Sequence, residues 1–293
     1  MFGQEKYKET NSVLNKKFDE KKILIAQHRG AKQGNVVENT NLAIKVAYLQ
    51  GADIVEIDVA KSTDGVLYSF HDTTEDKNLR LHLNIEKLSS SAIDELTQYN
   101  SIWEPSKYKV QKLEDITTTF NNGELFNFDR TWGKLPETFA LLKKHPSFIK
   151  QVILKGPPKK EILDVYENEK TKFMYMSLVK NLEELELVLS YKNINLVGLE
   201  LICRGDDDPL FQDELINKLH DMGLLLWINV ITLSNHDRHI LSSKYDDNKS
   251  LEEGYDKGWG KIIDKKFDIL LSDWSCLLSK YRDFKVKEAN NEK

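Results

Sequence analysis

Residues 23–28 read Ile-Leu-Ile-Ala-Gln-His, residues 39–50 read Asn-Thr-Asn-Leu-Ala-Ile-Lys-Val-Ala-Tyr-Leu-Gln, and residues 54–59 read Ile-Val-Glu-Ile-Asp-Val. The first and third stretches are short and largely apolar, which is typical of strands. The middle stretch has apolar residues at three- and four-residue spacing, which predicts a helix. Because strand, helix and strand alternate along most of the chain, we predict the α/β class and a TIM-like (β/α)8 barrel.

The chain offers nine strand candidates, one more than an eight-stranded barrel needs. One of them therefore forms an irregular or hairpin strand, and the pattern alone does not show which. The candidates are Ile23–His28, Ile54–Val59, Val66–His71, Leu125–Asp129, Gln151–Leu154, Phe173–Met176, Leu196–Leu201, Leu224–Val230 and Phe267–Ser272. The clearest helical stretches between them are Asn39–Gln50, Leu135–Lys144, Asn181–Leu189 and Leu210–Met222.

We expect a single domain, with the barrel over residues 23–286. A charged N-terminal extension (1–22) and a charged tail (287–293) flank it, and both ends should fray. After the third strand candidate, residues 72–112 are too many for one loop and predict an insertion over one mouth of the barrel. Within it we expect a helix at Ser91–Tyr99 and an aromatic, Pro-containing stretch at Trp103–Tyr108.

Composition narrows the class of function. The 293 residues include 42 basic and 47 acidic side chains, a net charge of −5, and the two signs are interspersed. No basic face stands out, so we expect no nucleic-acid partner. No apolar run approaches the roughly 20 residues that span a bilayer, so we expect no transmembrane segment, and peripheral membrane contact is not indicated. Residues 1–22 lack the apolar core of a secretory signal, which leaves a cytoplasmic chain and a mature secreted or periplasmic chain both open.

Carboxylates occur at the ends of predicted strands, where an α/β barrel carries its chemistry. Glu56 and Asp58 are two residues apart in one strand, so their side chains point to the same face. If that face is the barrel interior, the two converge and need a cation, and Asp129 at another strand end could supply a third ligand. Oxygen ligands of this kind suit Ca²⁺ or Mg²⁺. The alternative is that Glu56 and Asp58 face helices or solvent.

Two histidines end strand candidates, and cationic residues accompany them. His28 and His71 can form an acid/base pair, although the sequence does not assign base and acid between them. Arg29 offers a guanidinium that matches a phosphate. Lys155 follows another strand, and we expect its ammonium group at the same rim unless it is a solvated surface lysine. Together these groups describe a site for an anionic ester. Four further residues are possible pocket residues: Glu38, Asn39, Glu200 and Trp227.

Four motifs in series resemble, in order and spacing, those of glycerophosphodiester phosphodiesterases. They are His28-Arg29-Gly30, Glu38-Asn39-Thr40, Glu56-Ile57-Asp58-Val59 and His71-Asp72. The resemblance implies a phosphatidylinositol-specific phospholipase C-like barrel and a divalent cation held by the positions of Glu56, Asp58 and a third acid. It also implies hydrolysis of a glycerophosphodiester to glycerol phosphate and an alcohol, with a neighbouring glycerol hydroxyl as the first nucleophile.

One departure from the family pattern marks a divergent branch. The third ligand of the family is usually a Glu in a Glu-x-Lys strand end, whereas this chain has Asp129-Arg130. Lys155, one strand later, could take the place of the missing lysine.

Two rival functions fit the same scaffold. One is a phospholipase of the sphingomyelinase D-like or phospholipase C-like type, for which exposed apolar residues at the barrel mouth, such as Trp103 and Tyr108, would speak. The other is a non-catalytic barrel that binds a phosphorylated ligand, since a fold does not guarantee activity. The presence of both histidines beside Glu56 and Asp58 favours an enzyme.

Overall fold

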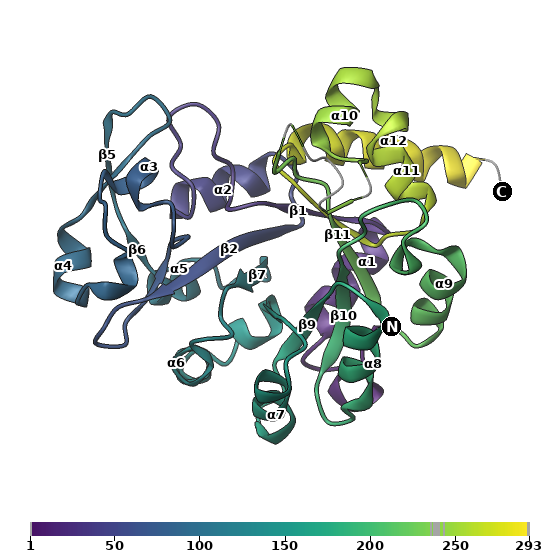
Figure 1. Ribbon diagram of the computed structural model, residues 1–293, viewed down its shortest axis with the longest axis horizontal. Helices are drawn as coiled ribbons and strands as arrows, with labels where there is room; N and C mark the ends of the chain where they lie inside the picture. Colours follow the sequence, from purple (N-terminus) through teal and green to yellow (C-terminus); the bar gives the residue numbers. More distant parts are fainter. Residues whose placement is uncertain (1, 235, 237–240, 243, 292–293) are drawn as a thin grey trace.

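The computed structural model describes residues 2–234, 236, 241–242 and 244–291, and within them eight parallel strands close into a barrel (Figure 1). β1 pairs with both β12 and β2, which closes the ring. The predicted TIM-like barrel is confirmed. Its strands, in order around the ring, are β1 (Leu24–Gln27), β2 (Ile54–Lys61), β7 (Leu125–Asp129), β8 (Val152–Gly156), β9 (Met174–Val179), β10 (Leu196–Leu201), β11 (Leu225–Asn229) and β12 (Ile269–Ser272).

The ninth strand candidate, Val66–His71, lies outside the barrel. It forms β3 (Leu67–Ser69), which runs antiparallel to the end of β2. The connection from Lys61 to Leu67 is a tight turn in which Gly65 has φ +87° and donates its N–H to Ser62. A parallel crossover needs a dozen or more residues, so a link this short permits only a hairpin. The length of this link can be read from the sequence, and it would have identified Val66–His71 as the candidate that does not belong to the barrel.

The insertion after β3 is a small lobe with its own core, seen on one side of the barrel in Figure 1. The helix expected at Ser91–Tyr99 is correct only for its first part, because the chain leaves the helix at Glu95 and then pairs as a hairpin. Trp103 lies in the hairpin connection and is 54% exposed. The elements of the lobe are α3 (Glu75–Leu79), η2 (Ile85–Lys87), α4 (Ser90–Glu95), β4 (Thr97–Tyr99), β5 (Pro105–Lys109) and β6 (Gln111–Lys112).

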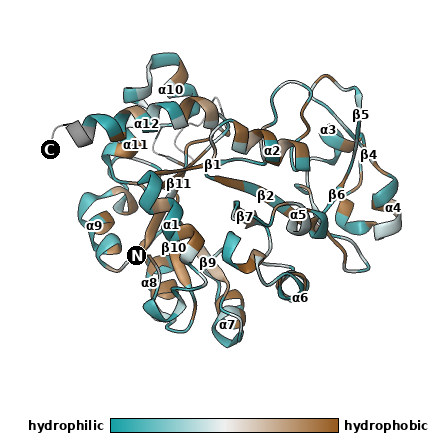
Figure 2. Ribbon diagram, turned by 180° about the vertical axis from the view of Figure 1, so that it is seen from behind, coloured by the Kyte–Doolittle hydropathy of each residue, from teal (hydrophilic) through white to brown (hydrophobic). Residues whose placement is uncertain are grey.

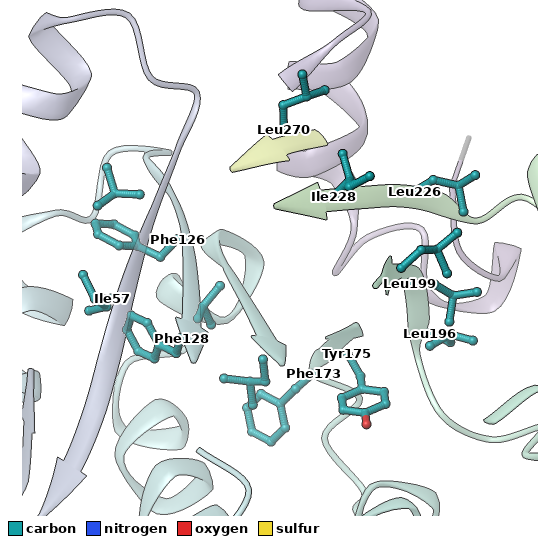
Figure 3. Close-up of a cluster of buried hydrophobic side chains, with 14 of the residues drawn as sticks. Ile57, Phe126, Phe128, Phe173, Tyr175, Leu196, Leu199, Leu226, Ile228 and Leu270 are labelled. Atoms are coloured by element: carbon teal, nitrogen blue, oxygen red, sulfur yellow. The ribbon is translucent and has the colours of Figure 1, made fainter. Parts of the chain in front are cut away.

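Helices surround the barrel and cover the outward faces of its strands. Figure 2 shows mainly hydrophobic colour along β1 and β10 and mixed colour on the surrounding helices. Figure 3 shows part of the resulting core, in which Phe126, Phe128, Leu199 and Ile228 lie among buried apolar side chains. These helices are α2 (Asn41–Leu49), α5 (Leu113–Thr119), α6 (Leu135–Lys144), α7 (Lys160–Asn168), α8 (Leu182–Ser190), α9 (Asp213–Asp221), α10 (Asp247–Glu253), α11 (Trp259–Asp264) and α12 (Ser275–Asn291), with short 3-10 turns at Phe148–Gln151, Pro209–Phe211 and Tyr255–Lys257.

The N-terminal segment does not fray as expected. After a short 3-10 turn (Glu5–Tyr7), residues Ser12–Lys21 form α1. Leu14 of this helix is fully buried in the cluster that fills the barrel interior, and Phe2 and Phe18 pack against the same cluster. The expectation was wrong because it rested on charge alone, although the few apolar residues of the segment lie on one face. At the other end, α12 continues to Asn291, so most of the predicted tail is helical.

No helix of the described residues is both long and apolar enough to cross a membrane.

Candidate active site

A cavity of about 360 Å³ lies at the carboxyl ends of the barrel strands, where chemistry is expected in this architecture. Its volume is within the usual range for small-molecule sites. Six of the predicted site residues meet there with Arg29: His28, Glu56, Asp58, His71, Asp129 and Glu200. The lining residues are His28, Arg29, Glu56, Asp58, His71, Asp129, Arg130, Trp132, Leu178, Lys180, Glu200, Ile202, Arg204, Asn229, Ile231, Leu233, Leu241 and Leu271.

Three carboxylates converge at one side of this cavity. Glu56 and Asp58 alternate with Ile54 on the interior face of β2, so the alternative that they face helices or solvent is wrong. Asp129 ends β7 directly beside Asp58 in the parallel register. One oxygen of each of the three carboxylates lies within 4.8 Å of the others.

The electrostatics of this cluster fit a divalent cation. Burial, together with the charges of Asp58 and Asp129, raises the pKa of Glu56 well above its usual range, and Lys155 and Arg29 oppose this only in part. Three carboxylates this close, two of them buried, cannot all stay ionised unless a positive charge lies among them. Because all the donors are oxygens, the set suits a hard cation such as Ca²⁺ or Mg²⁺.

Arg29 is held against the carboxylates by its backbone as well as its side chain. Its φ is +56°, an unusual value for a non-glycine residue, and its N–H donates to Glu56 Oε2 at 2.9 Å. Its guanidinium Nε lies 3.1 Å from Asp58 Oδ2, and its Nη1 lies 3.1 Å from Glu38 Oε1. The guanidinium therefore has a fixed direction along the cavity wall.

Glu38 and Asn39, predicted as possible pocket residues, stand behind the cavity and do not line it. Glu38 is buried, and its pKa falls to about 2: burial alone would raise it, but Arg29, Lys77 and Lys32 outweigh that effect. Asn39 donates its side-chain amide to Asp58 Oδ2 and accepts the Asp58 N–H. Both residues orient groups that do line the cavity.

His28 follows β1 and is held through one ring nitrogen. Its Nδ1 lies 2.9 Å from Asp273 Oδ1, and Lys32 Nζ lies 2.9 Å from the same oxygen. Burial lowers the pKa of His28, and Lys32 and Arg29 add to this, whereas Asp273 opposes it. The lowered pKa favours the neutral imidazole near pH 7, and Nδ1 faces both the Asp273 carboxylate and, at 3.0 Å, the Lys32 ammonium group.

His71 reaches the cavity by a route that differs from the prediction. It follows the antiparallel β3 and not a barrel strand, but β3 pairs with the end of β2 and so brings the ring beside the carboxylates. Its Nε2 lies 4.0 Å from Asp58 Oδ1. The two histidines thus lie on either side of the acidic cluster, one supported by β1 and the other by β3.

Lys155 is not at the rim, contrary to the expectation. It is 1% exposed and lies inside the barrel, where its Nζ is 2.5 Å from Glu200 Oε2 and 4.0 Å from the centre of the Trp227 ring. Burial alone would lower the pKa of Lys155, but Glu200, Asp129 and Glu56 raise it, so the ammonium group stays charged. Lys155 follows Ile153 by two residues on β8, which turns its side chain inward.

Of the two remaining pocket candidates, Glu200 lines the cavity and Trp227 lies beneath it. Asn229, which had no predicted role, donates to Glu200 Oε1 at 2.9 Å and accepts from the Trp227 indole at 2.7 Å. These bonds join β10 and β11 under the site.

Comparison with known proteins decides the family. Residues 28–194 match the glycerophosphoryl diester phosphodiesterase family, and they make up more than half of the chain. The chain belongs to this family. It is therefore an enzyme of the phosphoric diester hydrolase class. Residues 173–282 also match a domain of unknown function, and no curated protein matches the chain significantly.

Solved structures of family members share the fold at low sequence identity. A glycerophosphoryl diester phosphodiesterase from Parabacteroides distasonis is 17% identical, with a TM-score of 0.68 over 88% of this chain and 85% of that one. A glycerophosphodiester phosphodiesterase from Agrobacterium tumefaciens is 20% identical, with a TM-score of 0.62 over 88% and 99%. A phosphodiesterase from Oleispira antarctica, solved with the product sn-glycerol-3-phosphate, is 17% identical, with a TM-score of 0.60 over 89% and 96%.

In this member of the glycerophosphoryl diester phosphodiesterase family, the Asp129-Arg130 departure has a clear structural setting. Arg130 has φ +60° and lines the cavity, and its Nε lies 2.6 Å from Asp72 Oδ1. The chain thus places an arginine close to the point where the usual motif has a lysine. Asp72, the second residue of the His71-Asp72 motif, orients it.

Sequence reasoning missed two parts of the site. The first is the pair Asp273 and Lys32 that holds His28; Asp273 directly follows β12, so the rule that polar strand ends carry function could have found it. The second is a set of aliphatic side chains, the aliphatic wall, which line the far side of the cavity together with Lys180, Glu200, Arg204 and Asn229. It consists of Leu178, Ile202, Ile231, Leu233, Leu241 and Leu271. Apolar residues at strand ends look like core, so the sequence carried no signal for this wall.

Trp103 and Tyr108, the apolar residues considered for a phospholipase, do not line the cavity in the described part of the chain.

Proposed function

We propose that this enzyme hydrolyses glycerophosphodiesters to glycerol phosphate and an alcohol, in a reaction that depends on a divalent cation and on two histidines. The observation that carries the proposal is the convergence of Glu56, Asp58 and Asp129 with His28 and His71 around one cavity. Family membership supports the reaction, and the solved relative from Oleispira antarctica binds sn-glycerol-3-phosphate as its product.

Glu56, Asp58 and Asp129 would hold the cation, Ca²⁺ or Mg²⁺. When bound, it would offset the negative charge that develops on the non-bridging phosphate oxygens. Arg29 and Arg130, which line the same cavity, supply fixed positive charge to those oxygens. Lys155 is too deeply buried for the phosphate role first expected; instead, its charge limits the repulsion among the carboxylates above it.

His28 is our candidate for the general base. Its lowered pKa favours the neutral imidazole near pH 7, and a proton on Nδ1, donated to Asp273, would leave Nε2 as the nitrogen that accepts a proton. Nε2 would take the proton of the attacking hydroxyl group.

His71 is then the general acid. Its ring lines the cavity, and its Nε2 lies 4.0 Å from Asp58 Oδ1. This nitrogen would donate its proton to the alkoxide oxygen as the bond from that oxygen to phosphorus breaks. Each positioned acid or base contributes about 10²–10⁴-fold to the rate.

The test is hydrolysis of glycerophosphocholine and glycerophosphoethanolamine with Ca²⁺, Mg²⁺ or EDTA, using the wild type, His28→Ala and His71→Ala. We expect glycerol phosphate to be released only with a divalent cation and to be lost in both variants, whose circular dichroism should match the wild type. Full activity in EDTA would refute the cation, and full activity in either variant would refute that histidine. If no diester is cleaved with any metal, a phospho-ligand binding barrel becomes the better description.

A further inference from the structure

Two cationic side chains line the far side of the cavity without an opposite charge beside them. They are Lys180 and Arg204, both exposed, and no ion pair joins either of them to a carboxylate of the described residues. The other cations and the far-side carboxylate of the cavity are paired: Arg29 with Glu38 and Asp58, Arg130 with Asp72, and Glu200 with Lys155. Lys180 and Arg204 therefore hold the positive charge that a ligand can neutralise.

Both cations stand at the ends of neighbouring strands, β9 and β10, which lie side by side in Figure 1. Lys180 directly follows β9, and Ile202, which directly follows β10, donates its N–H to Val179 at 2.9 Å. Arg204 lies two residues beyond Ile202. β9 is two strands away from β7, which ends at Asp129, and at about 4.8 Å per strand this corresponds to roughly 10 Å. A single small ligand in the cavity can therefore reach the acidic cluster and both cations.

The carboxylates next to these cations in the sequence do not line the cavity among the described residues: Glu184, Asp206, Asp207 and Asp208. Glu184 accepts the backbone N–H of Lys180 at 2.7 Å, and Asp208 accepts the backbone N–H of Arg204 at 2.9 Å. Asp206 lies 3.1 Å from Lys244 Nζ, outside the cavity. The side-chain charges of Lys180 and Arg204 thus remain available to a ligand.

These two charges select among the alcohols that a glycerophosphodiester can carry. Choline and ethanolamine bring a positive charge, which Lys180 and Arg204 would repel. A neutral alcohol leaves both charges unmatched. A phosphate group offers three oxygens, enough for the planar guanidinium of Arg204 and the ammonium group of Lys180 together, whereas a carboxylate offers only two. A phosphate on the alcohol is therefore the group that gains most from this side of the cavity.

We propose that Lys180 and Arg204 bind a phosphate group carried by the alcohol of the substrate, so that the enzyme prefers glycerophosphodiesters of phosphorylated alcohols. The inference rests on the proposed function, because the diester phosphate lies at the same divalent cation and histidines. In the overall reaction water adds its hydroxyl group to the diester phosphorus, the bond from that phosphorus to the alcohol oxygen breaks, and that oxygen receives the proton. The products are glycerol phosphate and the phosphorylated alcohol.

Binding tests the two cations without requiring turnover. We would titrate the wild type by calorimetry, with Mg²⁺ in excess, with glycerol phosphate and with glycerol bisphosphate, which are monoesters and differ by one phosphate group. Each partly exposed ion pair contributes about two- to fivefold to affinity, so the bisphosphate should bind roughly tenfold more tightly. The difference should shrink as the salt concentration rises, because salt screens exposed charges. Equal affinities at low salt would overturn the inference.

Variants of the two cations show where the second phosphate group lies. Lys180→Gln and Arg204→Gln should each reduce the preference for the bisphosphate about two- to fivefold, and the double variant should abolish it. Both side chains are exposed, so the substitutions leave the core intact. The matched control is Lys45→Gln, at an exposed lysine on α2 outside the cavity, which should keep the full preference. A double variant that keeps the preference, or a control that loses it equally, would overturn this location.

Hydrolysis separates this inference from the proposed function. The matched substrates are glycerophosphoglycerol and the same diester with a phosphate group on its terminal hydroxyl. A higher kcat/KM for the phosphorylated diester, lost in the Lys180→Gln, Arg204→Gln double variant, would support both proposals. Equal cleavage of the two diesters would overturn the preference and leave the proposed function intact. If neither is cleaved although the bisphosphate binds more tightly, the proposed reaction is overturned and the second phosphate site is retained.

Discussion

The two sides of the cavity differ in how many of their side chains are charged. The catalytic side, at the ends of β1, β2, β3 and β7, holds charged groups that neutralise one another, such as Arg29 with Glu38 and Asp58. The other side, at the ends of β9 to β12, mixes the aliphatic wall with Lys180, Glu200, Arg204 and Asn229. Burying a charge is costly unless a partner is at hand, and the most deeply buried charge on this side, Glu200, is paired with Lys155.

This contrast assigns different work to the two sides. Substitution of a group on the catalytic side that transfers a proton or carries charge should slow the hydrolysis of every substrate, because every substrate presents the same phosphate. Substitutions on the other side should affect each substrate according to the alcohol that it carries. The experiments below test this division, beginning with the largest expected effect.

Loss of His71 should have the largest effect and should not depend on the substrate. We expect His71→Ala to lower kcat/KM by about 10²–10⁴-fold for glycerophosphocholine and for glycerophosphoethanolamine alike, since a general acid is lost from both reactions. The control is His82→Ala, because the His82 side chain is 92% exposed on the insertion. A loss confined to one of the two substrates would show that the sides of the cavity are not separate in function.

Asp273 should act through His28 with a smaller effect. In Asp273→Asn the imidazole loses a hydrogen bond to a charged group, worth about 1.5–3 kcal/mol, so kcat should fall roughly 10–100-fold. Asp273 also raises the pKa of His28 against the lowering by burial and Lys32. Its removal should therefore lower that pKa further.

The pH profile distinguishes this role from simple damage to the fold. The acidic limb of kcat/KM reports the free base, so in Asp273→Asn it should move to lower pH. A reduced rate with an unmoved acidic limb would mean that Asp273 does not set the charge of His28.

The catalytic side could be predicted largely from local sequence, and the reason is geometric. Glu56 and Asp58 are two residues apart on a strand, so their convergence follows from the strand period once the fold is known. The position of Asp129 beside them could be predicted from the rule that parallel strands of a barrel end at the same edge. Four motifs within residues 28–72 supplied the remaining residues.

The features that could not be predicted depend on contacts between segments far apart in the sequence, or on how deeply a side chain is buried. Asp273 meets His28 across 245 positions of sequence, and nothing local links the two. Lys155 was expected at the rim because it follows a strand candidate that seemed to end at Leu154, whereas β8 continues to Gly156 and holds Lys155 inside the barrel. The wall residues resemble ordinary core residues, and only their position around a cavity distinguishes them.

The buried pair of Lys155 and Glu200 lies where the two sides meet, and it offers a test based on stability. Both residues are almost fully buried, so Lys155→Met leaves the Glu200 carboxylate without its cation. Removing one partner of a buried pair typically costs about 3–5 kcal/mol. The double variant Lys155→Met with Glu200→Leu should recover part of the lost stability, because it leaves no buried charge without a partner.

Urea denaturation of both variants and the wild type measures the free energy of unfolding. A single variant as stable as the wild type would show that the pair does not stabilise the fold.

The smallest effect is expected at Asp247, which links the backbone behind the wall to the loop that bears Asp273. Asp247 accepts hydrogen bonds from the Trp259 indole at 2.8 Å, the Ser272 hydroxyl at 2.7 Å and the Asp273 N–H at 2.9 Å. Burial raises its pKa from 3.8 to about 7, even though these bonds oppose the change. Its contribution to stability is therefore fully present below about pH 3.8 and is lost as the pH rises through about 7.

Asp247→Asn removes this titration while keeping a polar side chain of the same size. At pH 5 the variant should melt at a lower temperature than the wild type, because asparagine offers one acceptor oxygen where the carboxyl group offers two. The difference in Tm should narrow between pH 5 and pH 8, since only the wild type then carries an ionised group in this buried position. Melting curves across that range, with the cation present throughout, measure it. A difference in Tm that stays constant would mean that Asp247 ionises as readily in the folded chain as in the unfolded one. Its hydrogen bonds would then stabilise the fold equally at both pH values.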